Sequence, residues 1–319
     1  MNRLHSTTSR NNNNEIREFK HEDVDYLEEI GNGYYGEVWL VRVHDQVSGT
    51  RRVHAAKKIR SGHLIVTEDP EAISELKALK NELEIYKQIQ GHPNFPQLIG
   101  VVRDDRNCCI ILEYVECGDL CSFLQQKAEM GMVVYQPVGD DDFDENTIFN
   151  RQEKQMRWKQ KIGPEPADGT MTTSILVYIA LQAALALKFL VVNLKILHRD
   201  TAARNVLIKD DYVIKITDFG LARNANYTGE SSVAFPFATW ALELLKTPSM
   251  FTEKTEVWQY GVLLCEIFSM GKKPYEKLLA AAKAAAAESG KNFSPKTAIE
   301  EFLERGGRLE APQIMPNPM

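Results

Sequence analysis

Several residue types that define common classes of protein are scarce in this 319-residue chain. Its five cysteines form no CxxC pair and have no companion histidine cluster. The sequence therefore indicates neither a zinc site nor a disulfide framework, and it fits a reducing compartment. Basic residues are not in excess, because the formal net charge is -6. Since neutralising a phosphate backbone needs a basic face, we expect no nucleic-acid partner.

The chain also lacks an uninterrupted apolar run that would span a membrane. Its longest apolar stretch, Ile175 to Val192, is interrupted by Gln182 and Lys188. These two side chains are costly in hydrocarbon, so the stretch predicts a buried core helix. We recognise no signal peptide. The expectation is a cytoplasmic chain without a transmembrane segment.

Hydrophobic patterns predict strands first and helices later. Residues Val38 to Ile59 read as two strands joined by a turn at Ser48–Thr50, which indicates a small antiparallel sheet. Apolar residues at helical spacing predict a helix over Ser74–Gln90, ending at Gly91. Cys109–Leu112 reads as a buried strand.

The same patterns suggest a division into parts. Residues 1–20 are polar and are interpreted as a disordered tail, followed by a first lobe over 21–117 and a second over 118–319. Within the second lobe, residues 126–170 lose their periodicity and are interpreted as an exposed insert. Residues Ala280–Ala287 form an alanine-rich, strongly helix-forming run.

Two motifs carry the chemistry. His198-Arg199-Asp200 is followed by Asn205 in the pattern H-R-D-x-x-x-x-N, and Asp218-Phe219-Gly220 comes shortly after. From about Tyr26 to about Pro312 the chain resembles a protein tyrosine kinase of the receptor type, which carries an insert at the corresponding place. The resemblance implies an α+β fold of two lobes, one with a small antiparallel sheet and one helix and the other mostly helical.

The resemblance also implies roles for single residues. Asp200 is the expected base or orienting group for the substrate hydroxyl, and Asn205 and Asp218 are expected to hold Mg2+. Lys57 is expected to contact the α- and β-phosphates of ATP, with Glu82 as its carboxylate partner. Taken singly, a loop aspartate is more often a turn former and a strand lysine a solvated surface group. The joint spacing favours the phosphoryl-transfer site.

A glycine pattern, G-x-G-x-x-G-x-V, spans residues 31–38 and opens a predicted hairpin, which suits a lid over ATP. A dinucleotide-binding fold would need a helix next, and a merely flexible turn is the plainer alternative. Ala55 is expected on the same strand face as Lys57. Together with the resemblance, this gives the expected nucleotide-binding set Gly31, Gly33, Gly36, Val38, Ala55, Lys57, Leu112, Glu113, Val115 and Leu207.

Other features favour tyrosine as the acceptor. Arg204 lies in an A-A-R sequence like that of tyrosine kinases and is counted with the catalytic residues, and the pair Phe235-Pro236 resembles their substrate platform. The expected substrates are therefore proteins with tyrosine acceptors. Tyr227 is predicted to be autophosphorylated, with Arg199 as the candidate receiver of its phosphate. Tyr135 is a candidate docking site for adaptors that bind phosphotyrosine.

The resemblance further implies an internal stack of side chains that links the Glu82 helix to the catalytic loop. Its expected members are His198, Phe219, Tyr86 and Leu98.

The chain departs from the family at several positions. Thr201 replaces a leucine, Leu242 a proline, and Glu256 an aspartate that normally caps the catalytic loop from a buried helix. The family's last helices are expected to be absent, and with them the arginine partner of Glu243. A buried, unpaired Glu243 would cost several kcal/mol, or a rearrangement would avoid that cost. The alanine-rich run is then a hypothetical replacement that covers exposed core.

The predicted function is therefore transfer of the γ-phosphoryl group of Mg-ATP to protein tyrosine hydroxyls. The chain would then be a signalling phosphoprotein, cytoplasmic or the intracellular part of a membrane receptor. The alternative is a catalytically impaired kinase fold that serves as a nucleotide-binding or protein-interaction module. It draws its support from Leu242, Glu256 and the shortened C-terminal part.

Overall fold

The computed structural model of the chain describes residues 16–33, 36–44, 49–59, 70–102, 108–134, 169–225, 237–313 and 315. They separate into two compact units, each treated by itself below. The sheet unit comprises the described residues of Met1–Leu79 and Gln97–Tyr114. The helical unit comprises those of Lys80–Pro96 and Val115–Met319.

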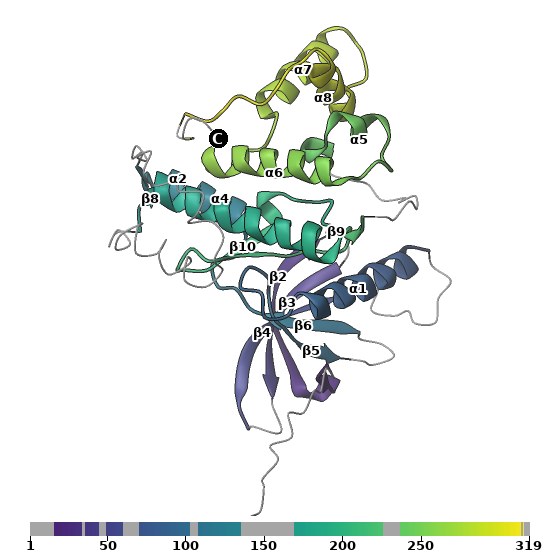
Figure 1. The fold of residues 1–319 in the computed structure, drawn as a ribbon, viewed down its shortest axis with the longest axis vertical. Coiled ribbons are helices and arrows are strands. Elements are labelled where there is room, and N and C mark those ends of the chain that lie inside the picture. Colours follow the sequence, from purple (N-terminus) through teal and green to yellow (C-terminus); the bar gives the residue numbers. More distant parts are fainter. Residues whose placement is uncertain are drawn as a thin grey trace, which may run out of the picture. The chain divides into compact units, whose positions relative to one another are not determined.

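The sheet unit is built on one six-stranded sheet (Figure 1). The strands lie in the order β1-β5-β6-β4-β3-β2, and all neighbours are antiparallel except β1 and β5. Their bounds are Glu18–Phe19 for β1, Val24–Gly33 for β2, Gly36–His44 for β3, Arg51–Lys58 for β4, Leu98–Val102 for β5 and Cys109–Glu113 for β6.

One face of this sheet carries the apolar core of the unit. Val41 on β3, Ala56 on β4 and Ile111 on β6 are fully buried in one cluster. Because successive side chains on a strand point to opposite faces, Val38, Lys57 and Leu112 belong to the other face. The two strands predicted within Val38–Ile59 and the strand predicted at Cys109–Leu112 are confirmed. Ser48 of the predicted turn lies outside the described residues.

Helix α1, Pro70–Gln88, follows β4. It begins four residues earlier than the predicted Ser74 and ends two residues before Gln90. Pro70 stands at the first helical position, where the preset φ of proline and its missing N–H both suit a helix start. The division between the two units falls inside this helix, after Leu79.

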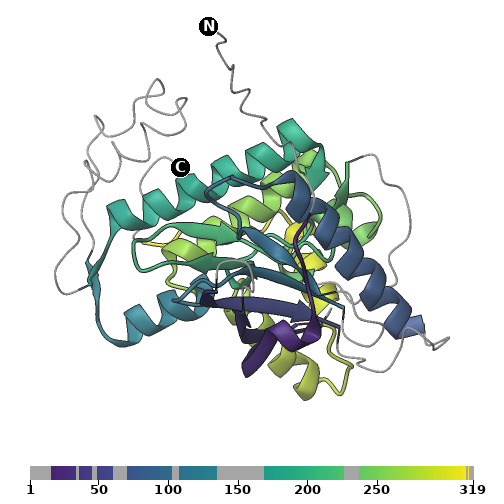
Figure 2. The same cartoon turned by 90° about the horizontal axis from the view of Figure 1, so that it is seen from below.

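The helical unit is organised around two long neighbouring helices, α4 (Thr173–Lys188) and α6 (Glu253–Phe268), which run side by side in both Figure 1 and Figure 2. The Tyr260 hydroxyl on α6 donates a hydrogen bond to the Ala180 carbonyl oxygen on α4 at 3.0 Å. The remaining helices are α2 (Leu120–Glu129), the π-helix η4 (Phe189–Leu194), α5 (Leu242–Lys246), α7 (Glu276–Glu288) and α8 (Pro295–Glu304), with 3-10 turns η5 (Ala203–Asn205) and η6 (Phe237–Thr239).

The apolar stretch around Ile175 forms α4 and η4. By length and composition Thr173–Leu194 would suffice to cross a membrane, but most of it is buried inside the protein. Ile175, Leu176 and Ile179 are fully buried. The prediction of a buried core helix is therefore confirmed.

The insert predicted over residues 126–170 begins later than predicted. Residues 126–129 complete the last turn of α2, and β7 (Val133–Val134) pairs with β8 (Met171–Thr172) in parallel. Both flanks of the insert thus belong to the helical unit. Residues 135–168, including Tyr135, lie outside the described part of the chain.

Helices α5, α7 and α8 share an apolar cluster in the last part of the helical unit. Leu244, Leu245, Ile299 and Leu303 are buried in it, and Leu278 and Leu279 of α7 pack against it. None of the α7 residues is itself buried. The alanine-rich run therefore forms a helix in which most alanines are exposed, while Ala282 and Ala286 are half-buried.

Of the two outcomes expected for Glu243, a buried carboxylate is not what the structure shows. Glu243 lies exposed in the first turn of α5. At this position its carboxylate keeps its water and faces the positive end of the helix dipole, which favours a negative charge. The predicted α+β architecture, an antiparallel sheet with one helix and a mostly helical second part, is confirmed.

Candidate active site

A short hairpin in the helical unit brings the two motif loops together. The catalytic loop follows β9 (Ile196–Leu197) and leads into β10 (Val206–Ile208), which pairs antiparallel with β11 (Ile214–Ile216). Beyond the hairpin, the backbone N–H of Thr217 donates to the Asn205 carbonyl oxygen at 2.9 Å. Since Asp218 is the next residue, this bond places the start of the second motif beside the end of the first.

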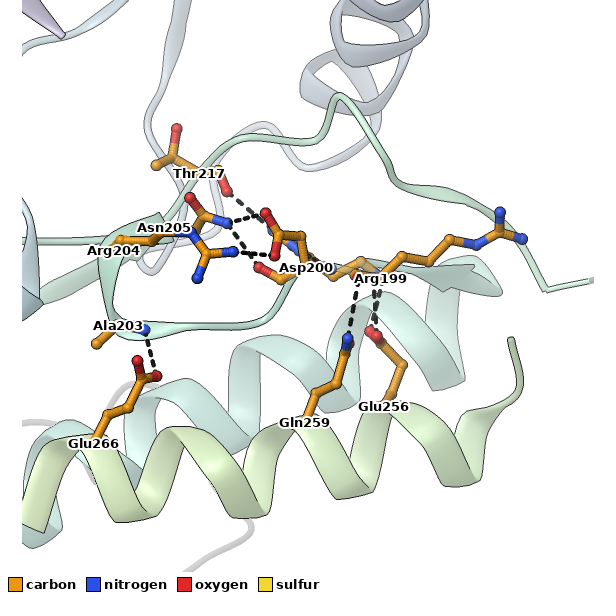
Figure 3. Close-up of polar contacts among 10 residues, drawn as sticks. Arg199, Asp200, Ala203, Arg204, Asn205, Thr217, Glu256, Gln259 and Glu266 are labelled. Carbon is orange, nitrogen blue, oxygen red and sulfur yellow. Dashed lines mark hydrogen bonds and ion pairs between the residues drawn. The ribbon is translucent and has the colours of Figure 1, made fainter. Parts of the chain in front are cut away.

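The carboxylate of Asp200 is held from within its own loop (Figure 3). Asn205 Nδ2 donates to Asp200 Oδ2 at 2.7 Å and also to the Asp200 carbonyl oxygen at 2.7 Å. The Arg204 guanidinium forms an ion pair with Asp200 Oδ1. Asp200 is buried, whereas Arg204 is exposed. The predicted catalytic and metal-holding residues of this loop therefore converge on one carboxylate.

Three side chains of α6 bond the backbone of the same loop, rising from one face of the helix in Figure 3. Glu256 accepts from the N–H groups of His198 at 2.7 Å and Arg199 at 2.9 Å. Gln259 Nε2 donates to the Arg199 carbonyl oxygen at 3.0 Å, and Glu266 accepts from the Ala203 N–H at 2.9 Å. The longer side chain at Glu256 therefore still makes both backbone bonds.

Burial governs the electrostatics of these carboxylates. It raises the pKa of Glu256, and the nearby His198 and the two backbone donors oppose that rise. It also raises the pKa of Glu266 to about 7, against the Ala203 N–H and the charge of Arg204. Both groups thus bear a desolvation cost that their backbone bonds partly offset.

The protonation of Glu266 predicts a pH-dependent stability. On unfolding, its pKa returns from about 7 to the ordinary 4.5, so the folded chain binds more protons between these values. The free energy of unfolding should therefore fall as pH rises through this window, by about 3 kcal/mol from this group. Denaturant unfolding at pH 4.5 and pH 8 should show this extra loss relative to the Glu266→Gln variant. Equal losses in both chains would contradict the prediction.

The second motif is tied to the later turns of α1. Phe219 N–H donates to Glu82 Oε1 at 3.3 Å, and Asn81 Nδ2 donates to the carbonyl oxygens of Phe219 at 3.3 Å and Ala222 at 2.9 Å. Asp218 has a left-handed backbone with φ 63°. A residue with a Cβ adopts this conformation at a cost, so the surrounding bonds must hold it. These contacts stabilise the turn that presents Asp218.

Three of the four members of the predicted stack are in contact. The Phe219 ring lies 5.3 Å from that of Tyr86 and 5.2 Å from that of His198, between centroids. The Tyr86 hydroxyl and Thr217 Oγ1 are 3.1 Å apart, and His198 Nε2 is 3.0 Å from the Thr217 carbonyl oxygen. Leu98 lies in β5 of the sheet unit, so its place in the stack stays a prediction.

In the sheet unit, the register gathers five of the predicted nucleotide-binding residues on one face. Val38 lies opposite both Gly31 and Lys57, and Ala55 lies opposite Leu112. Directly opposed residues of antiparallel strands share a face, so these five form one surface, away from the apolar core. The Glu113 N–H donates to the Gln97 carbonyl oxygen at 2.8 Å and is thus used within the sheet. Val115 and Leu207 belong to the helical unit.

Strand alternation separates the two adjacent lysines. Lys58 Nζ lies 3.2 Å from Glu37 Oε2 and 4.8 Å from the centroid of the Trp39 ring. Lys57 points to the opposite face, which it shares with Val38 and Ala55. Lys57 is therefore the lysine on the predicted nucleotide face. Its pairing with Glu82, which belongs to the helical unit, stays a prediction.

Gly36 is required by the close approach of two strands. Its φ is 143°, and a Cβ at this position would overlap the carbonyl oxygen of Lys58. Gly36→Ala should therefore push β3 from β4 beside Lys57 and lower the free energy of unfolding by about 2 kcal/mol. Gly261→Ala is the matched control, because a Cβ there meets nothing within 4 Å on helix α6. Denaturant unfolding should show a loss for Gly36→Ala alone, and equal stability of the two variants would contradict it.

Some predicted residues fall elsewhere. Tyr227 and the pair Phe235-Pro236 lie outside the described residues. Arg199, the candidate phosphate receiver, is buried with its guanidinium carbon 4.6 Å from the centroid of the Phe251 ring. Thr201 is buried, and its Oγ1 has no hydrogen-bond partner among the described residues.

Sequence reasoning missed three residues that the structure ties to the motifs: Asn81, Gln259 and Glu266. A signal for two of them exists. Gln259 and Glu266 follow Glu256 by three and ten residues in a mostly apolar stretch, a spacing that places all three on one helical face. Asn81 lies next to Glu82 and carries no comparable pattern.

The residues expected to hold Mg2+ have a suitable donor set. Asn205 uses its amide nitrogen for both bonds to Asp200, which leaves Oδ1 as the atom suited to a cation. Amide and carboxylate oxygens, such as those of Asn205 and Asp218, are ligands that Mg2+ accepts alongside phosphate oxygens. In the described part of the chain no cluster of three or more His, Cys, Asp or Glu side chains suits a metal. A purely protein-held metal centre therefore has no support there.

The fold and these motif loops define a protein kinase domain. The family model described as protein tyrosine and serine/threonine kinase matches residues 24–318, so the chain belongs to this family. A fibroblast growth factor receptor of Ciona intestinalis is 30% identical over 303 residues, which are 93% of this chain and 34% of the receptor. The fibroblast growth factor receptor homolog 1 of Drosophila melanogaster is 31% identical over 287 residues, 89% of this chain and 32% of that protein.

A further relative is not called a receptor. The tyrosine-protein kinase csk-1 of Caenorhabditis elegans is 29% identical over 296 residues, 92% of this chain and 41% of that protein. The chain thus spans between about a third and two fifths of these relatives' length. The family is shown, and the relative named as a tyrosine-protein kinase bears on the proposal that follows.

Proposed function

We propose that this chain transfers the γ-phosphoryl group of Mg-ATP to tyrosine hydroxyls of proteins. The single observation that carries the proposal is the convergence of Asn205 and Arg204 on the carboxylate of Asp200. A carboxylate held in this way can accept the proton of a substrate hydroxyl or orient it for attack. When bound, Mg-ATP supplies the phosphoryl group and the charge neutralisation that the transfer needs.

Each remaining part has a candidate role. Lys57, paired with Glu82, would hold the α- and β-phosphates, and Asn205 and Asp218 would hold the metal. The loop around Gly31, Gly33 and Gly36 would cover the phosphates, and Leu112 and Leu207 would contact the base. Support for tyrosine as the acceptor comes from the A-A-R sequence at Arg204 and from the relative named as a tyrosine-protein kinase. A cytoplasmic location and phosphotyrosine-binding adaptors belong to the same proposal.

One assay tests this function. The purified chain is incubated with labelled Mg-ATP and a tyrosine-containing polymer, beside the Asp200→Asn variant. Label on tyrosine from the native chain, and its loss in the variant, is the expected result. Label on serine or threonine would reject the acceptor, and nucleotide binding without transfer would favour the interaction module.

A further inference from the structure

The residue before Asp200 has an unusual backbone. Arg199 adopts the left-handed backbone conformation with φ 68°, which residues other than glycine rarely adopt. Such a conformation persists only where its surroundings over-determine it. The next peptide group consists of the Arg199 carbonyl and the Asp200 N–H. Its orientation sets the direction in which the Asp200 side chain points.

Helix α6 holds both peptide groups that flank Arg199. The Glu256 carboxylate accepts a hydrogen bond from the Arg199 N–H at 2.9 Å. Gln259 Nε2 donates a hydrogen bond to the Arg199 carbonyl oxygen at 3.0 Å. The Asp200 N–H, at the far end of this second peptide group, lies 3.4 Å from His198 Nδ1. Gln259 is therefore the α6 side chain that bonds directly to the peptide group carrying Asp200.

Gln259 is a polar side chain in a buried position that an apolar residue could occupy. Its side chain is fully buried, and its Oε1 has no hydrogen-bond partner in the part of the chain that the structure describes. An apolar residue of similar volume would avoid the desolvation cost of that oxygen. The bond from Nε2 to the Arg199 carbonyl oxygen offsets part of this cost, which indicates a role for that bond.

We propose that Gln259 is a positioning residue for Asp200, acting through its hydrogen bond to the Arg199 carbonyl oxygen. This inference rests on the proposed kinase function. Without the bond, the peptide group between Arg199 and Asp200 can rotate, and the carboxylate spends less time aimed at the substrate hydroxyl. Gln259 does not touch nucleotide in this scheme, so its loss should act on the rate of transfer rather than on ATP binding.

Gln259→Met removes the donor while keeping the length of the side chain. The expected result is a kcat about tenfold lower with the KM for ATP unchanged. Lys254→Met, at an exposed position of the same helix, is the control and should leave both constants unchanged. An unaltered kcat, or a fall in kcat matched by an equal change in KM, would overturn the proposal.

Gln259→Glu adds a readout that packing alone would not move. A protonated carboxyl can donate to the Arg199 carbonyl oxygen, whereas a carboxylate repels it, so the variant-to-native ratio of kcat should fall as pH rises. Glu256, His198 and Arg199 are present in both chains, and their titration largely cancels in this ratio. A low ratio that does not change with pH would reject the hydrogen bond as the cause, whereas a ratio near one at low pH supports it. This ratio remains measurable should Gln259→Met fold poorly.

Hydrogen exchange separates this inference from the proposed function. In Gln259→Met, amides of residues 198–203 should exchange at least several-fold faster than in the native chain, with α4 unaffected. This measurement needs no substrate. A native chain that transfers no phosphate would reject the kinase proposal, while unchanged exchange at residues 198–203 would by itself reject the role of Gln259.

Discussion

Asp200→Asn is expected to lower kcat for tyrosine phosphorylation by about a thousandfold while leaving the fold intact. The substitution keeps the shape of the side chain but removes the proposed acceptor of the hydroxyl proton. It also turns an amide NH2 towards either Asn205 Nδ2 or the Arg204 guanidinium, both of which now donate to Asp200. Steady-state kinetics with Mg-ATP and a tyrosine-containing polymer would measure the loss.

Asp210→Asn provides a matched control for that experiment. Asp210 lies exposed in the turn between β10 and β11, five residues after Asn205, and undergoes the same change in charge. Its kcat should stay within about twofold of the native value, as expected for a surface substitution away from the site. Equal activity of Asp200→Asn and Asp210→Asn would remove Asp200 from the proposed mechanism.

Glu256→Ala is expected to lower the free energy of unfolding by about 3 kcal/mol and to reduce kcat at the same time. The variant leaves the N–H groups of His198 and Arg199 buried without their present acceptor. It also opens a cavity beneath the catalytic loop, and the surroundings of a buried side chain fill such a cavity only in part. Arg199 then loses one of the hydrogen bonds that hold its left-handed backbone, so the Asp200 carboxylate should be less well oriented towards the substrate hydroxyl.

Denaturant unfolding of Glu256→Ala beside Glu253→Ala would test this. Glu253 stands exposed in the first turn of the same helix, where removal of its charge costs less than about 1 kcal/mol through the helix dipole. Comparable losses in the two variants would show that the buried carboxylate does not support the loop. A stable Glu256→Ala variant with full activity would contradict both parts of the prediction.

Local patterns predicted much of the sheet unit and the core helix α4 of the helical unit. Period-two alternation places Lys57 and Ala55 on one face and Lys58 on the other, as the register shows. The apolar run around Ile175 predicted a buried helix because two polar interruptions make a lipid environment costly. The glycine pattern at residues 31–36 predicted the join between β2 and β3, although residues 34 and 35 lie outside the described part.

Other features depend on partners far away in the chain. The first turns of α1 have little apolar periodicity, so its start at Pro70 was missed. The sequence left open whether Glu243 is buried or exposed, because its exposure depends on how α5 packs against α8. The bonds of Gln259 and Glu266 span about sixty residues of chain, and no local pattern names their acceptors.

By itself, the sequence determined several strands and helices, the two motif loops and the lysine that faces away from the sheet's core, since these follow from periodicity and short-range spacing. Only the tertiary structure decided what holds Asp200 in place. Buried carboxylates and amides need partners within hydrogen-bond reach, and whether Glu256, Gln259 and Glu266 find them depends on the packing of α6 beneath the catalytic loop.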